Sequence, residues 1–570
     1  MSNWKRTTNK LIWITLALGW GGTTLPAIAA QRLTLRLGPF EQVVAVSDLE
    51  QFAKTGRLSP ALQPYAVLLT PQVRQALNRR LQINSSTGEK LIERTLHSPT
   101  GKRLLSSLGA AFPDSTIPQL QLAALLAVRQ AQGLSPVSFL RAYPTENVTV
   151  DASSAIALAL QFNPAYWQSQ ALSPILERDL FVNSNIPFQP TFNPAQSGTQ
   201  VVHQETLFLL DRSRHRTIPV DLYWSANTQG PLVVISHGFG ANRKFLAYLA
   251  HHLASYGLTV AALEHPGSNA SWLNSVSSGK NPGGLLSGKE FIDRPKDISF
   301  LLDELAKLNQ QSGPLQGKLY TQQVTAIGHS LGGYTVLALA GGEIDVVQLR
   351  QFCQSAISIG SSPSDLIECA AADLPYGKLQ LKDRRITQVI ALNPLVGHLF
   401  GKNGLTQVTT PVLLLASTED ALTPIVNNQL RPFTQFNRSK YLLTAIGATH
   451  LSVADPTYLG DTMTESTLVK ERRGAETQSL RNLVQGVSLA FIELTSQPQT
   501  YAPFLTSAYA QSLSTPQLPL RLNSKLPASI TSWIDVVVEV SQLPRQLGHP
   551  QLFIPAPFLV LWQKKMVKRY

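Results

Sequence analysis

The chain has 570 residues, of which 44% are hydrophobic and 15% are charged. This length exceeds one ordinary domain, and the composition is that of a globular protein rather than a disordered or fibrous one. The formal net charge is +13, but the sequence has no zinc-finger spacing, RNA-binding aromatic signature or helix-turn-helix, so we expect no nucleic-acid partner. The basic excess instead favours a solvated surface or a peripheral contact with an anionic membrane surface.

Residues 1–29 have the pattern of a secretory signal peptide. Three basic residues precede an apolar run that is followed by Ala27-Ile28-Ala29, a small-residue cleavage pattern. The run is short and broken by glycine, so it makes a poor membrane span, although an uncleaved anchor is the alternative. We therefore expect the mature chain to be exported to the periplasm or the extracellular space.

Residues 30–192 are predicted to form a helix-rich domain. Five polar cap residues each precede a proline suited to a first helical turn: Ser59-Pro60, Thr70-Pro71, Ser135-Pro136, Asn163-Pro164 and Ser173-Pro174. Ser47 and Glu50 have the spacing of a capping box. No cluster of titratable residues indicates chemistry in this region, so a packing or lid role is expected.

Residues 200–495 have a different pattern, in which short apolar runs alternate with amphipathic segments. A hairpin is predicted over Glu205 to Trp224, and helices are predicted after Asn242 and from Pro295. The later strand candidates are 232–235, 258–263, 324–327, 386–392, 412–416 and 441–446. This alternation predicts an α/β fold, a mostly parallel sheet with helices on both faces.

Two long connections in this region, 265–292 and 343–383, are predicted cap insertions over a site. Trp272, Leu285 and Leu286 in the first are candidates to line an acyl pocket. Cys353 and Cys369 lie in the second, and the sequence leaves open whether they form a disulfide or remain free thiols. Residues 496–570 form a C-terminal extension whose apolar and basic end suits a packed edge segment or a membrane-surface contact.

Gly328-His329-Ser330-Leu331-Gly332 matches the Gly-x-Ser-x-Gly pattern between a strand and a helix. The glycines permit a strained turn that exposes the serine hydroxyl at the carboxyl end of the sheet. Because a serine hydroxyl is nearly inert at neutral pH, it needs a base to take its proton and an acid to orient that base. Ser330 is therefore the predicted nucleophile.

The base and the acid are sought after Ser330, in the chain order serine, acid, histidine. Only three histidines follow it, and His450 is preferred over His398 and His549 because it comes directly after the last strand candidate. Asp420 ends the preceding strand candidate and is the predicted acid, with its neighbour Glu419 as the alternative.

The oxyanion hole needs two backbone amides aimed at the developing negative oxygen. Ser236-His237-Gly238-Phe239-Gly240 follows the first parallel strand candidate, where such a loop belongs. We assign one amide to Phe239 and the other to Leu331, and we expect no metal and no organic cofactor.

These motifs, in this order, resemble the α/β hydrolases over roughly residues 200–494. HGFGANR with GHSLGG is similar to the platelet-activating-factor acetylhydrolase group, which dienelactone hydrolase-like proteins also approach, although dienelactone hydrolases have a cysteine nucleophile where this chain has Ser330. The acetylhydrolase acid follows the preceding strand, where this chain has Asn393, so Asp420 takes the role from the later position. The layout of the whole chain resembles exported cyanobacterial α/β hydrolases.

The resemblance and the motifs together predict a serine hydrolase acting on lipid or other acyl esters. An exported acyltransferase would use the same triad with an alcohol in place of water. A non-catalytic binding or scaffold protein on the same fold is the alternative from another class, although the chain retains all three candidate triad residues.

Overall fold

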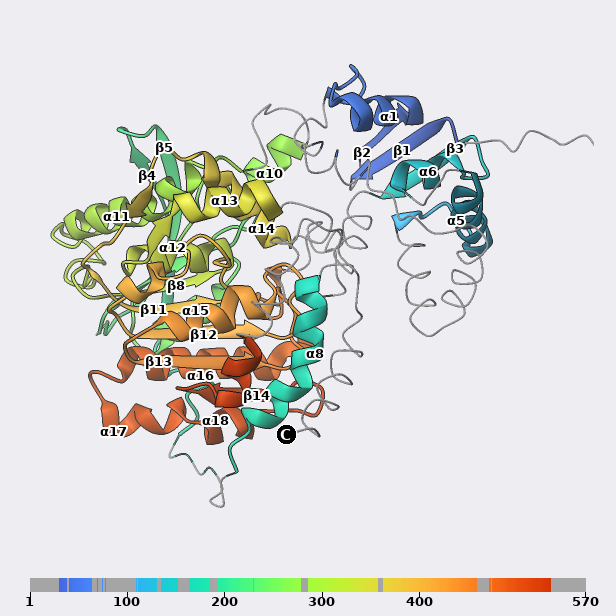
Figure 1. Ribbon diagram of the computed structural model, residues 1–570. Helices are drawn as coiled ribbons and strands as arrows, with labels where there is room; N and C mark the ends of the chain where they lie inside the picture. The colour runs from blue at the N-terminus through green and yellow to red at the C-terminus, as the bar shows by residue number, and fades with distance from the viewer. Residues whose placement is uncertain are drawn as a thin grey trace, which may run out of the picture. The chain divides into compact units, whose positions relative to one another are not determined.

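Figure 1 shows the computed structural model of the protein. The residues it describes are 30–37, 40–63, 111–130, 135–151, 164–183, 192–228, 230–277, 286–356, 362–458, 471–472 and 474–534, with the single residues 69, 74, 77, 109, 188 and 190. The predicted signal peptide, Leu285, His549 and the apolar and basic chain end lie outside them. The chain divides into two compact units, Met1–Gln63 with Val73–Ala152 and Pro64–Gln72 with Ser153–Tyr570.

The first unit contains a three-stranded sheet beside its helices, which the prediction of a helix-rich region did not include. β1 (Arg32–Leu37) pairs antiparallel with β2 (Phe40–Ala45) and parallel with β3 (Asn147–Asp151). The helices of this unit with described bounds are α1 (Val46–Thr55), α5 (Ile117–Gln130) and α6 (Pro136–Arg141). The alternation of polar residues and leucine in RLTLRL is a period-two strand signal that the sequence analysis missed.

The predicted helix starts of this unit are confirmed in one case. Ser135 caps α6 by accepting a hydrogen bond from the Ser138 amide, and Pro136 opens the helix. The capping box at Ser47 is wrong, because α1 already begins at Val46 and has no side-chain cap. Ser59-Pro60 lies in an irregular turn, and Thr70-Pro71 lies outside the described residues.

Helix α8 (Pro164–Asp179) belongs to the second unit, so the first unit ends near residue 152 instead of residue 192. The helix begins at Pro164, as Asn163-Pro164 predicts, but it continues through Pro174, where a second start was expected. Its Ser173 hydroxyl donates a hydrogen bond to Thr418, at 3.0 Å. The last part of the predicted N-terminal domain thus belongs to the second unit.

The second unit is built on a nine-stranded sheet in the order β14-β13-β12-β11-β8-β6-β7-β5-β4. Its strands are β4 (Val202–Asp211), β5 (Arg216–Ser225), β6 (Leu232–Ser236), β7 (Val260–Leu263), β8 (Val324–His329), β11 (Ile386–Leu392), β12 (Val412–Ser417), β13 (Lys440–Ala445) and β14 (Leu520–Asn523). The six strands from β13 to β7 run parallel, and the β4–β5 hairpin and β14 are antiparallel at the two edges. The predicted hairpin and parallel sheet are confirmed.

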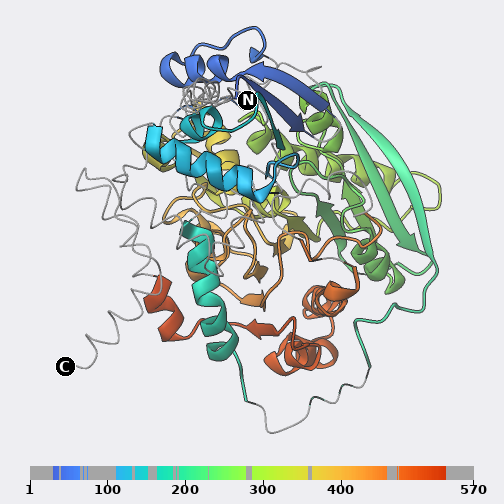
Figure 2. The same cartoon turned by 90° about the vertical axis from the view of Figure 1, so that its right-hand side faces the viewer.

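Strand β14 comes from the predicted C-terminal extension, so that extension completes the sheet. The guanidinium of Arg521 in β14 donates to the carbonyl of Glu177 in α8, and the Asn523 amide donates to the carbonyl of Leu180. Figure 1 and Figure 2 both show α8 beside this edge of the sheet. Two segments at opposite ends of the second unit's sequence therefore pack together.

Helices cover both faces of the sheet, as predicted. The helices of the second unit besides α8 are α9 (Ala247–Ser255), α10 (Ala270–Ser277), α11 (Glu290–Leu308), α12 (Leu331–Leu339), α13 (Val346–Ala356), α14 (Pro363–Glu368), α15 (Arg431–Gln435), α16 (Gln478–Glu493), α17 (Pro498–Tyr501) and α18 (Ser507–Ser512). Leu232 and Val234 of β6 pack into the core under α11 and α12, whereas Val233 and Ile235 pack into the core under α9 and α16. Burial on both faces explains why the strands read as unbroken apolar runs.

Helix α11 begins at Glu290, before the predicted start at Pro295, which lies inside the helix. A proline has no N–H, so it cannot donate to the carbonyl four residues earlier, which belongs to Phe291. The hydroxyl of Tyr334 in α12 donates to that carbonyl instead. The tyrosine satisfies the orphaned acceptor and joins α11 to the helix that follows Ser330. The other predicted start is also shifted, because the helix expected after Asn242 begins at Ala247.

A disulfide joins Cys353 of α13 to Cys369, which decides the alternative left open by the sequence. Beside it, the buried carboxylate of Glu368 accepts hydrogen bonds from three successive backbone N–H groups, at residues 397–399. Burial raises the pKa of Glu368 to about 7. The second cap insertion thus holds the loop that follows β11.

Within the described residues, no helix is both long enough and apolar enough to cross a membrane.

Replacing Cys353 and Cys369 together by serine is expected to lower the free energy of unfolding by about 3 kcal/mol, because the bond closes a loop of sequence separation 16. Urea denaturation followed by circular dichroism measures the change. Reductant should shift the midpoint of the wild type and leave that of the double variant in place. Equal midpoints for the oxidised wild type and the variant would contradict the prediction.

Candidate active site

Ser330 occupies the bend between β8 and α12, with φ 56° and ψ −119°. A non-glycine residue with positive φ is strained, and the flanking glycines explain how the bend is tolerated. A Cβ on Gly328 would lie 2.1 Å from the Gly332 carbonyl oxygen, and one on Gly332 would lie 2.1 Å from the Ser236 carbonyl oxygen. The strand–turn–helix context that gives the Gly-x-Ser-x-Gly pattern its meaning is therefore present.

His450 and Asp420 follow β13 and β12 and meet at the carboxyl edge of the sheet. His450 Nδ1 lies 2.7 Å from Asp420 Oδ2, and both side chains are buried. Because a carboxylate accepts, Nδ1–H donates to it, and the ring presents Nε2 as its proton acceptor. This is the arrangement that orients a general base.

Asp420 is held by a turn that the sequence analysis did not single out. Its Oδ1 accepts the backbone N–H groups of Leu422, at 2.9 Å, and Thr423, at 2.7 Å. The Thr423 hydroxyl donates to Oδ2, at 2.7 Å, and lies 3.3 Å from His450 Nδ1. These donors hold the Asp420 carboxylate in place beside the His450 ring. The sequence feature that could have indicated this turn is an aspartate followed three residues later by a threonine, because both residue types form hydrogen bonds to the local backbone in turns.

The backbone of His450 is fixed beside the residue that precedes Ser330. Its carbonyl accepts hydrogen bonds from His329 Nε2, at 3.0 Å, and from Asn393 Nδ2, at 3.2 Å. The His329 and His450 rings lie 4.6 Å apart between centroids. The Ser330 hydroxyl and the His450 ring, both described, share no hydrogen bond, a contact that often tightens only when substrate binds.

Glu471 is a second carboxylate beside the histidine, and sequence reasoning missed it. It accepts hydrogen bonds from the Thr449 hydroxyl and from the Leu451 backbone N–H, so it fixes the chain on both sides of His450. Burial lowers the pKa of His450, but the charge and hydrogen bond of Asp420 and the charge of Glu471 outweigh it, and the net shift is upward.

The pH profile of kcat/KM is expected to show an acid limb above the ordinary histidine value of about 6.5, because the base must be neutral to accept a proton. Glu471→Gln keeps an acceptor oxygen but removes the negative charge, so the limb should move to lower pH. Initial rates with a soluble ester from pH 5 to 9 measure it. A limb that stays in place or moves upward would contradict the assignment.

The alternatives considered for acid and base are placed elsewhere. The His398 ring stacks on Phe352, with centroids 3.5 Å apart, and lies 3.5 Å from Asp365, so the cap insertion engages it. The Glu419 carboxylate makes no hydrogen bond with His450, and both are described residues.

Phe239 and Leu331, the two predicted oxyanion donors, border Ser330. Leu331 is the first residue of α12, and a Cβ on Gly238, which precedes Phe239, would lie 3.1 Å from Ser330 Cβ. Neither backbone N–H has an acceptor among the described residues. Both amides are thus available at the bend, as donors to an oxyanion must be.

Comparison with known proteins bears on the fold. A family described as alpha/beta hydrolase of unknown function (DUF1400) matches residues 29–151, and platelet-activating factor acetylhydrolase, isoform II, matches residues 212–283. The platelet-activating factor acetylhydrolase of Cavia porcellus is 30% identical over 138 residues, which are 19% of this chain and 31% of that protein. The chain has the α/β-hydrolase fold. The acetylhydrolase-like match includes the Phe239 loop and stops before Ser330.

Asn393 marks where this chain departs from the acetylhydrolase pattern stated above. It follows β11 with φ 42°, is fully buried, and donates from Nδ2 to the His450 carbonyl. An amide at this position holds the histidine loop, while the carboxylate at Asp420 contacts the ring. Two positions on neighbouring strands thus divide the positioning of His450.

Proposed function

We propose that this α/β hydrolase is a serine carboxylic-ester hydrolase. The observation that carries the proposal is the 2.7 Å contact between His450 and Asp420 at the sheet edge where Ser330 occupies a strained bend. The acetylhydrolase-like relatives support ester hydrolysis. Described residues include no cluster of His, Cys, Asp or Glu suited to a metal ion, and the proposed chemistry requires none.

In this mechanism the Ser330 oxygen attacks the ester carbonyl while His450 Nε2 accepts the hydroxyl proton. Asp420 stabilises the imidazolium, and the Phe239 and Leu331 amides bind the oxyanion. The ester bond then breaks, the alcohol leaves with the proton from His450, and an acyl-enzyme remains. Water, deprotonated by His450, attacks that acyl group and releases the acid and the free serine.

Lipid or other acyl esters are the proposed substrate class. The similarity of this chain to the platelet-activating factor acetylhydrolase of Cavia porcellus supports this proposal. An acyltransferase would form the same acyl-enzyme and pass it to an alcohol. Product analysis with and without an added alcohol distinguishes the two, because transfer would give a new ester at the expense of the free acid.

An active-site-directed fluorophosphonate tests the proposed nucleophile. The wild type should be labelled on the peptide that contains Ser330, and Ser330→Ala should not be labelled. Labelling of another peptide, or equal labelling of the variant, would reject the serine mechanism and favour the non-catalytic alternative or another nucleophile.

Export is part of the proposal, supported by the disulfide, since such bonds persist mainly in oxidising compartments. N-terminal sequencing of secreted material should begin near Ala30. Recovery of intact Met1 would reject cleavage of a signal peptide.

A further inference from the structure

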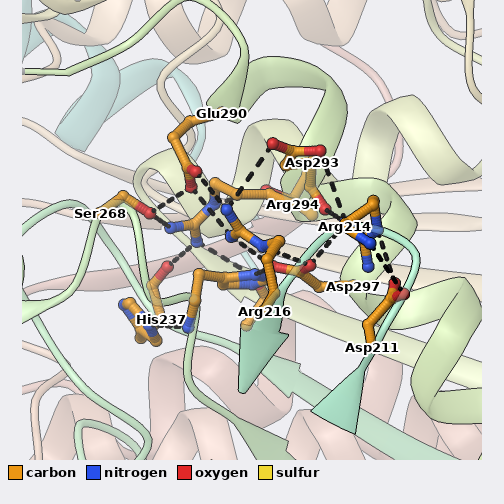
Figure 3. Close-up of polar contacts among 12 residues, drawn as sticks. Asp211, Arg214, Arg216, His237, Ser268, Glu290, Asp293, Arg294 and Asp297 are labelled. Carbon is orange, nitrogen blue, oxygen red and sulfur yellow. Dashed lines mark hydrogen bonds and ion pairs between the residues drawn. The ribbon is translucent and has the colours of Figure 1, made fainter. Parts of the chain in front are cut away.

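A buried network of charged residues lies beside the loop that carries Phe239 (Figure 3). Its three arginines come from the β4–β5 turn, β5 and α11, and its carboxylates come from the end of β4 and from α11. The charged members are Arg214, Arg216, Arg294, Asp211, Glu290, Asp293 and Asp297. Buried charges are costly unless they are paired, and the ion pairs of Arg214 and Arg216 with these carboxylates hold the β4–β5 hairpin against α11.

One part of the network has the connectivity of a catalytic triad. Ser236 Oγ lies 3.0 Å from His265 Nε2, and His265 Nδ1 lies 2.9 Å from Asp297 Oδ2. All three residues are fully buried, so a substrate cannot reach the Ser236 hydroxyl. This chain of hydrogen bonds therefore has a structural role. Asp297 fixes the proton of His265 on Nδ1, and Nε2 accepts a hydrogen bond from the Ser236 hydroxyl.

Arg294 carries this support to the oxyanion loop. Its guanidinium donates to Ser268 Oγ, at 2.7 Å, to Ser236 Oγ, at 3.2 Å, and to the carbonyl oxygen of His237. The arginine is fully buried, and burial lowers its pKa to about 10, so it remains charged at neutral pH.

The His237 ring makes two hydrogen bonds that fix its proton. Nε2 accepts the backbone N–H of His265, at 3.0 Å, so Nε2 carries no proton. Nδ1–H therefore donates to the carbonyl oxygen of Gly238, at 2.6 Å. Burial, the charge of Arg294 and the neighbouring His265 lower the pKa of His237 well below its ordinary value, consistent with a neutral ring.

We propose that His237 is a positioning residue for the oxyanion hole, which it preorganises by fixing the peptide between Gly238 and Phe239. In a trans peptide the carbonyl and the N–H point in opposite directions. The Gly238 carbonyl accepts its shorter hydrogen bond from His237 Nδ1–H, at 2.6 Å, and a longer one from the Ala241 N–H, at 3.3 Å. The Phe239 N–H therefore points away from His237, and it has no acceptor among the described residues. The direction of the Phe239 N–H, the proposed oxyanion donor, is thus fixed before substrate binds.

This inference rests on the proposed ester hydrolysis, and two substitutions separate the ring's two contacts. The side-chain nitrogen of His237→Asn is attached at the same carbon as Nδ1, so it can still donate to the Gly238 carbonyl. The end of His237→Gln reaches the position of Nε2, so it can still accept from His265, but it leaves the Gly238 carbonyl only the longer hydrogen bond from the Ala241 N–H, at 3.3 Å.

His237→Gln is expected to lower kcat by on the order of 10²-fold, the effect of losing one oxyanion donor, with KM little changed. His237→Asn should stay within about tenfold of the wild type. Binding of a trifluoromethyl ketone, which forms a tetrahedral adduct with the serine, should weaken in parallel with kcat. His252→Gln, at a buried histidine of α9, controls for the loss of a buried ring.

Equal kcat values for the Asn and Gln variants, or a Gln variant as active as the wild type, would overturn the positioning role. If Ser330→Ala were also active, the proposed function would fail; if it were inactive, this inference alone would fail. Should the Gln variant not fold, nitrogen-15 spectra of histidine-labelled wild type give an independent test. They should show His237 neutral with its proton on Nδ1 from pH 6 to 8, and the other tautomer would contradict the proposal.

Discussion

Ser330→Ala is expected to lower kcat for a p-nitrophenyl ester on the order of 10⁶-fold, because the residues of a triad act as a unit and the nucleophile has no substitute. The residual rate should come from the oxyanion donors and substrate binding alone. Stopped assays with variant prepared free of wild-type enzyme measure the loss.

Adding His450→Ala to Ser330→Ala should cost little more, since a base without its nucleophile contributes little. The thermal unfolding midpoint of each variant controls for misfolding. A double variant much slower than Ser330→Ala would show that His450 acts on some other group, and a Ser330→Ala variant with substantial activity would reject the nucleophile.

Asp420→Asn is the second large expected effect, about a 10⁴-fold loss in kcat. The asparagine amide can donate where the carboxylate accepts, so it favours the tautomer of His450 that carries its proton on Nε2, facing the serine. The lost negative charge also leaves the imidazolium unsupported.

Glu419→Gln is the matched control, because it removes a neighbouring carboxylate that the sequence left as the alternative acid. This variant should stay within about threefold of the wild type. A larger loss at Glu419 than at Asp420 would exchange their roles. The same ester assay, run at the pH optimum of each variant, separates a change in rate from a shift in the acid limb.

The sequence was most informative where a single side chain or a regular hydrophobic pattern determines the local structure. The parallel strands β6, β7, β8, β11, β12 and β13 pack into cores on both faces of the sheet, so each reads as an apolar run. The glycines around Ser330 indicate a bend at which a larger residue would clash. Chain order then selected Asp420 and His450, which the structure brings within 2.7 Å. Local pattern and three-dimensional arrangement agree there.

Contacts between distant segments could not be predicted in the same way. β3 pairs with β1 across more than a hundred residues, and Glu471 reaches the Thr449 hydroxyl through a fold that its local sequence does not reveal. The role of Pro295 likewise depends on Tyr334, which supplies the donor that lets α11 continue. These features depend on contacts between segments that are far apart in the sequence. No hydrophobic periodicity or motif spacing in the sequence indicates such contacts.

The packing of α8 against β14 has a consequence for how the protein is made. The sheet edge needs residues 520–523, but α8 leaves the ribosome more than three hundred residues earlier. The helix meets its earlier partners near Thr418 first, and its packing is complete only when the strand near the end of the second unit is present. Shortened chains that end before residue 520 should aggregate, however complete their triad.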